Sequence, residues 1–121
     1  MQEEKVRARA DEHVLWGSKV LVSGWKSGKF DGRRAVALGV RVGREFANQF
    51  FDKRWDAVLV ELDDKIVSVR LTKTFWTTCP ELRSPAIGAW MKKQGLAPWP
   101  KGRPPELRLT PMGRNKFRLA E

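Results

Sequence analysis

The sequence has few of the side chains with which small proteins build covalent or metal-based structure. Its 121 residues include one cysteine, one histidine and no tyrosine. A single cysteine excludes an internal disulfide framework and a cysteine-rich zinc site, and a single histidine excludes any mechanism that needs two. The sequence also contains no Gly-x-x-x-x-Gly-Lys phosphate-binding motif. We therefore expect no cofactor and no metal.

Long apolar stretches are missing as well. Uncharged apolar runs such as residues 35–40 are far shorter than the roughly 20 residues that span a bilayer. Residues 1–5 lack the apolar core of a secretory signal. These absences predict a protein that is not secreted, has no membrane contact, and works in the cytoplasm, on the nucleoid or in a nucleus. They give no indication of its oligomeric state.

Acidic side chains are outnumbered by basic ones. The chain has 24 Lys and Arg against 14 Asp and Glu, for a net charge of +10 and a pI of about 10.4. Such an excess in a small domain is typical of a protein that binds a polyanion. Residues 55–78 are net −1, whereas residues 79–121 are net +6, so the middle of the chain is predicted to be structural. Nucleic acid, above all duplex DNA, is the expected partner, although an acidic protein would also suit this charge.

The hydrophobic pattern predicts one α+β domain over residues 1–121 that is mostly β. Apolar residues make up 41% of the chain, which is enough for a core, and residues 1–12 are charged and free to fray. We expect an open pseudobarrel of six to seven short strands with two short helices, and a Pro-rich loop over residues 97–105. Gly39 indicates a bulge or a close backbone approach inside a strand. The predicted helices cover residues 44–53 and 85–94, and the predicted strands cover 14–23, 35–42, 55–62, 66–71, 107–110 and 116–119; residues 72–78 are β-prone.

The most informative stretch is residues 33–51, where a strand runs into a short helix bearing Phe-Ala-x-x-Phe-Phe. Residues 55–62, Trp-Asp-Ala-Val-Leu-Val-Glu-Leu, then open a hairpin. This order resembles the DNA-binding pseudobarrel superfamily, which includes plant domains of the auxin-response-factor type and effector domains of some type II restriction endonucleases. The resemblance covers about residues 18–78 and matches no diagnostic motif. A swapped-hairpin transcription regulator is similar over residues 35–71 alone.

The resemblance implies a two-armed grip on duplex DNA, in transcription regulation or in restriction–modification. The arms would be the basic loop 25–34 and the Thr-rich and aromatic segment 72–78. Residue chemistry supports both arms, because glycines allow close backbone approach, Arg can bind guanine bidentately, and Lys and Thr can contact phosphates. If binding is sequence-specific, we expect Arg33 and Arg34, with Thr74 or Thr77, to reach base edges. The alternative for Arg33 and Arg34 is that they form a solvated strand edge. The predicted DNA-binding residues are Trp25, Lys26, Lys29, Arg33, Arg34, Lys73, Thr74, Thr77, Lys101 and Arg103.

Exposed aromatic side chains would favour a second function. Trp25, Trp76 and Trp99 lie in loop-like basic surroundings, which suits base stacking in a single-stranded DNA-binding or RNA-binding module. The alternative is that these indoles form satellite core beneath long loops. That alternative is favoured for Trp99 because prolines flank it.

A cluster of acidic residues gives a third function, a small magnesium-dependent nuclease. Oxygen ligands would hold the cation, and a lysine would stabilise the developing charge. The spacing is poor, because two of the acids fall in an expected hairpin turn and another at the far end of the strand, so we do not expect an enzyme. The cluster consists of Asp56, Glu61, Asp63, Asp64 and Lys65.

Overall fold

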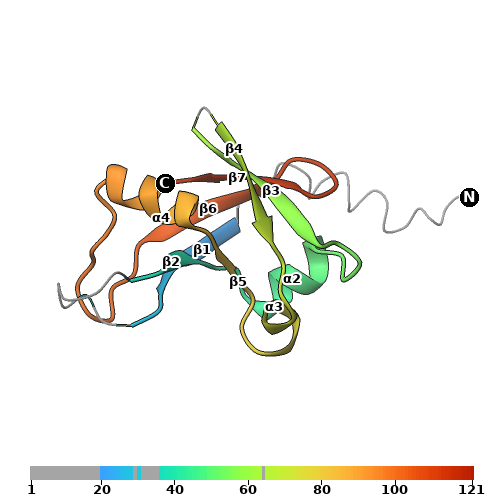
Figure 1. Ribbon diagram of the computed structural model, residues 1–121, viewed down its shortest axis with the longest axis horizontal. Helices are drawn as coiled ribbons and strands as arrows, with labels where there is room; N and C mark the ends of the chain where they lie inside the picture. Colours follow the sequence, from blue (N-terminus) through green and yellow to red (C-terminus); the bar gives the residue numbers. More distant parts are fainter. Residues whose placement is uncertain (1–19, 29, 31–35, 64) are drawn as a thin grey trace, which may run out of the picture.

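Seven strands form one sheet that curls almost into a closed barrel (Figure 1). The computed structural model describes residues 20–28, 30, 36–63 and 65–121. The order across the sheet is β4-β3-β7-β6-β1-β2-β5, and the two edge strands, β4 and β5, come close to each other. The strands are β1 (Val20–Lys26), β2 (Leu38–Arg41), β3 (Ala57–Leu62), β4 (Lys65–Arg70), β5 (Glu81–Arg83), β6 (Glu106–Pro111) and β7 (Lys116–Ala120); the helices are α2 (Arg44–Phe50), α3 (Lys73–Thr77) and α4 (Pro85–Lys93).

Alternation of burial along β3, β6 and β7 places the core inside the barrel. In β3, Val58, Val60 and Leu62 are buried, whereas the intervening Leu59 is exposed. This two-residue period follows from strand geometry, in which successive side chains point to opposite faces. The sheet joins distant parts of the chain, because β1 pairs with β6 and β3 pairs in parallel with β7. Residues 79–121 therefore belong to the barrel and are not a separate lobe.

Helices α2 and α3 lie together at one end of the barrel (Figure 1). Aromatic side chains pack between them and the sheet. The ring of Phe51, just after α2, stacks on that of Phe117 in β7 with centroids 4.7 Å apart. The ring of Phe75 in α3 lies 5.0 Å from that of Phe51. Phe46 of α2 adds an edge contact to Phe117 at 6.3 Å. These contacts fix both helices against the core.

Helix α4 covers β2 and is held to the β3–β4 turn. Ser84 caps its first turn by accepting a hydrogen bond from the Ala86 amide at 3.1 Å, and Pro85 occupies the first helical position, as predicted. Beyond the helix, Gly95 has a φ of +77° and reverses the chain. Within the described ranges, no helix has both the length and the apolar character that crossing a bilayer requires.

The mostly-β architecture confirms the predicted fold class, with four differences in detail. A third helix, α3, replaces the β-prone segment 72–78, and it buries Phe75 against Phe51. Helix α2 ends at Phe50, since Phe51 has extended backbone angles. The short edge strand β5 was not predicted. Strand β1 continues to Lys26, past the expected loop start, because it pairs with β2 up to Leu38.

Candidate nucleic-acid interface

The first arm begins at the end of β1. Trp25 and Lys26, expected in a loop, are strand residues paired with Gly39 and Leu38 of β2. Beyond them, the Ser27 amide donates to the Ala37 carbonyl, and the Ala37 amide donates to the Ser27 hydroxyl oxygen, each at 3.0 Å. These two hydrogen bonds close the base of the β1–β2 loop. The remaining predicted residues of this arm, Lys29, Arg33 and Arg34, lie outside the described residues.

The Pro-rich loop 97–105 packs against this first arm. The Gly24 amide donates to the Pro105 carbonyl at 2.9 Å, and the rings of Phe30 and Trp99 meet edge to face at 4.9 Å. Trp99 is buried as predicted, although it belongs to the main core and not to a satellite of it. The exposed Lys101 and Arg103 belong to this same loop. Tertiary structure thus brings two segments together that are about 75 residues apart in sequence.

Next to the first arm, two arginines share one buried glutamate. Glu81 of β5 accepts hydrogen bonds from Nε and Nη2 of Arg41 on β2, at 3.3 and 3.1 Å, and from Nη2 of Arg83 at 3.1 Å. The Glu81 side chain is 2% exposed, whereas those of Arg41 and Arg83 are 56% and 47% exposed. We call these three residues the arginine–glutamate cluster. Two guanidinium groups are thereby presented to solvent in fixed orientations.

Trp25 joins the cluster to the first arm. The Arg83 guanidinium carbon lies 4.6 Å from the centroid of the Trp25 ring, close enough for a cation–π contact. Both residues pair with Gly39 from opposite sides, and Gly39 has no side chain to separate them. A Cβ at Gly39 would lie 2.2 Å from the Leu82 carbonyl oxygen, so the predicted close backbone approach at this glycine is confirmed.

The second arm is α3 with its flanking threonines. Lys73, Thr74 and Thr77 are all exposed, as a DNA contact requires. Thr77 already donates its hydroxyl hydrogen to the Lys73 carbonyl at 3.0 Å. Thr74 accepts from Thr72 at 3.2 Å and keeps its own hydrogen for an acceptor such as a phosphate oxygen. Of the two threonines, Thr74 is therefore the better phosphate donor.

Arg44 connects the second arm to the strand that carries the cluster. It is the first residue of α2, three positions after Arg41, and its Nη2 donates to the Thr78 carbonyl at 3.3 Å. The cationic side chains of Arg83, Arg41 and Arg44 therefore form a strip that begins beside the Trp25 ring and ends at Lys73 of α3. We call this surface the strip. Sequence reasoning missed Arg41, Arg44, Glu81 and Arg83, because their proximity depends on the pairing of β2 with β5.

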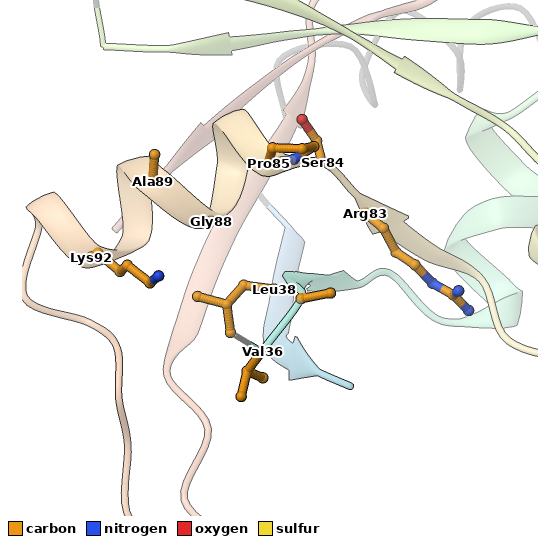
Figure 2. Close-up of a pocket in the computed structure, with 9 residues that line it drawn as sticks. Val36, Leu38, Arg83, Ser84, Pro85, Gly88, Ala89 and Lys92 are labelled. Atoms are coloured by element: carbon orange, nitrogen blue, oxygen red, sulfur yellow. The ribbon is translucent and has the colours of Figure 1, made fainter. Parts of the chain in front are cut away.

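A pocket of about 550 Å³ adjoins the strip between the start of β2 and α4 (Figure 2). Figure 2 shows Lys92 of α4 reaching toward Leu38 across this hollow, while Arg83 leaves β5 on the side away from α4. The charged residues that line the pocket, Arg83 and Lys92, are both basic. The other lining residues are small or apolar: Val36, Ala37, Leu38, Ser84, Pro85, Gly88 and Ala89. The pocket extends the basic surface toward α4.

The acidic residues considered for a nuclease site are dispersed. Asp63 accepts hydrogen bonds from Trp90 Nε1 at 2.9 Å and Gln94 Nε2 at 3.0 Å, which ties the β3–β4 turn to α4. Glu61 accepts from Arg118 Nε at 3.0 Å on the outside of the sheet. Asp56 precedes β3 at its opposite end, and Asp64 lies outside the described residues. Among the residues that the structure describes, no three His, Cys, Asp or Glu side chains gather as a metal site.

Comparison with protein-family models, curated proteins and solved structures finds no match to this chain. The resemblance to the pseudobarrel superfamily thus stays a prediction, and function is argued from the geometry of the strip.

Proposed function

We propose that this chain binds double-stranded DNA across the strip, with the two arms on either side of the arginine–glutamate cluster. The cluster carries the proposal. A buried carboxylate that holds two half-exposed guanidinium groups preorganises donors for a planar or anionic acceptor, which lowers the entropy lost on binding. A solvated surface that served only solubility would not need this alignment.

Residues of both arms are proposed to anchor the DNA backbone. Lys73, Thr74 and Arg44 surround the second arm and are suited to phosphate oxygens, which accept hydrogen bonds from side chains of any orientation. Lys101 and Arg103 would anchor the backbone at the first arm. Lys26 is tied locally, because its ammonium donates to the Gly28 carbonyl and lies 5.5 Å from the Phe30 ring. Lys29, Arg33 and Arg34 stay predicted contacts of the loop.

The tryptophans give less support to a single-stranded or RNA-binding module. Trp99 is buried, and Trp25 carries Arg83 against its ring. Trp76 is half-buried, meets Phe75 edge to face at 5.0 Å, and lies 5.9 Å from the Lys53 ammonium. Base stacking requires an open ring face, so these contacts favour duplex binding.

Binding of the full chain to matched duplex DNA, single-stranded DNA and RNA over a salt series tests the proposal. We expect a preference for duplex and a linear fall of log affinity with log salt, because phosphate contacts release counterions. A preference for a single strand or RNA would favour the stacking module. Weak, indiscriminate binding would refute nucleic-acid binding and point to an acidic protein partner.

A matched pair of lysines tests the placement of the strip. Lys73→Ala should weaken binding evenly across sequences and reduce the salt slope by about 1. Lys65→Ala removes the same charge from β4, next to the turn that contacts α4, and should leave both quantities unchanged. Equal losses for the two variants would mean that net charge alone, and not the strip, drives binding.

A further inference from the structure

The two arginines of the arginine–glutamate cluster make different hydrogen bonds to Glu81. Arg41 uses two nitrogens, Nε and Nη2, on one oxygen of Glu81. Arg83 uses Nη2 alone, on the other oxygen. Among the described residues, Glu81 is the one hydrogen-bond acceptor of Arg83, and it takes one of the two Nη2 hydrogens. The second Nη2–H, together with the adjacent N–H of Nε or Nη1, can still form a parallel pair of donors to a ligand. Arg83 therefore keeps the larger set of donors.

Arg83 is also the better aligned of the two. Its guanidinium is placed by Glu81 and by the Trp25 ring, 4.6 Å away, yet the side chain remains 47% exposed. Side chains that recognise a base must hold their orientation without their target, and supporting residues provide that hold. A phosphate contact does not need such support.

The charge of the cluster favours a base over a phosphate. One carboxylate shared by two guanidinium groups leaves a net charge of +1, which weakens their attraction for an anion. The carboxylate leaves the direction of the remaining N–H donors intact. A neutral pair of acceptors in one plane suits this arrangement, and guanine O6 and N7 in the major groove are such a pair.

We propose that Arg83 reads a guanine in the major groove, with Glu81 and Trp25 as positioning residues. This inference rests on the proposed duplex binding and adds which residue selects which base. Arg41, whose Nε and Nη2 donate to Glu81, holds Glu81 in place and would contact the DNA next to that guanine.

Selection of binding sites from a randomised duplex library, followed by affinity measurements, tests the inference. Wild-type protein should select sites with a guanine fixed at one position, and replacing that base pair should weaken binding roughly 5- to 150-fold. Arg83→Lys keeps the charge but removes the planar fork. It should lose the preference for guanine at that position, while affinity for the unselected library changes less than about threefold.

Two further variants separate recognition from structure. Glu81→Gln keeps the size of the side chain and removes its charge. It should relax selection of the guanine and strengthen binding to the unselected library, because the strip gains one net positive charge. A purely structural role of Glu81 would weaken both. Arg118→Lys is the matched control and should change neither measurement. Arg118 lies on β7, away from the strip, is 53% exposed, and forms an ion pair with Glu61 of β3.

The outcomes distinguish this inference from the proposed function. If wild-type protein fails to bind duplex at low salt, both are refuted. If it binds duplex but selects no guanine, or if Arg83→Lys weakens all sequences equally, Arg83 is a phosphate contact and the inference alone is refuted. Thermal unfolding of each variant confirms that the compared proteins are folded.

Discussion

The Gly39→Ala substitution tests how tightly β2 and β5 are packed. An alanine Cβ at this position would lie 2.2 Å from the Leu82 carbonyl oxygen and 3.0 Å from its carbonyl carbon. Ordinary carbon–oxygen contacts are about 3.3–3.6 Å, so one backbone must move by about 1 Å. The contact is with backbone, so no side-chain rotation can relieve it. Strand β5 is three residues long and carries both Glu81 and Arg83.

The expected cost follows from this geometry. Overpacking of a well-packed site costs about 1–3 kcal/mol, and each backbone hydrogen bond lost between β2 and β5 adds about 1 kcal/mol. We expect Gly39→Ala to lower the free energy of unfolding by about 3 kcal/mol, or the melting temperature by roughly 10 °C. Displacement of β5 should also misalign the arginine–glutamate cluster, so duplex affinity should fall at temperatures where the variant is folded.

Denaturant unfolding followed by tryptophan fluorescence measures the first effect. Gly28→Ala is the matched control, because a Cβ there would meet nothing within 4 Å and its φ is not positive. It should change stability by less than about 1 kcal/mol, in the stabilising direction if at all. A Gly39→Ala protein within about 0.5 kcal/mol of wild type, with unchanged duplex affinity, would refute the close approach described above.

Two other predictions concern the turn after β3 and the surface near α2. Asp63→Ala should lower the free energy of unfolding, measured by chemical denaturation, by about 2–4 kcal/mol, because the buried Trp90 loses an acceptor and alanine disfavours the φ of +50° at this position. Asp63→Asn keeps an acceptor oxygen and should lower it by under about 1 kcal/mol. Similar losses for both variants would contradict this account. Hydrogen bonds from Arg54 lower the pKa of Asp52 to about 2, so a carboxyl titration by NMR should find a midpoint there that returns toward the ordinary value in Arg54→Ala. Because the folded-state pKa of Asp52 is depressed, any stability from the Asp52–Arg54 pair is present above about pH 4 and is lost as the pH falls toward 2. A stability difference between wild type and Arg54→Ala that persists below pH 2 would contradict the assignment of this pKa to Asp52.

Local pattern was enough to predict the elements that local physics controls. Alternation of apolar residues identified the β3–β4 hairpin, and Ser84 with Pro85 marked the start of α4 to the residue. Phe46 and Phe50, four positions apart, marked α2, because a helix must bring its apolar residues onto one face. The charge distribution likewise predicted that the middle of the chain is structural, and β3 and β4 lie within it.

Pairings across long distances were decided by tertiary structure alone. Nothing in the local pattern indicates that β3 pairs in parallel with β7 or that residues 81–83 form the edge strand β5. The β-prone segment 72–78 became helix because the barrel end needed Phe75 in its core. Local propensities span about 1 kcal/mol, whereas burying a phenylalanine contributes about 1.5–3 kcal/mol, so packing prevails.

The candidate site shows the same division. Its basic character and the exposed residues of the second arm could be predicted from composition and spacing. The arginine–glutamate cluster could not, because Glu81 is 40 residues from Arg41 and the two meet through one register of β2 against β5. A buried carboxylate and two aligned guanidinium groups arise from that register alone. The sequence by itself determined that the surface is basic; the sheet decided which cations stand together, because only strand pairing fixes side chains from distant segments at hydrogen-bonding distance.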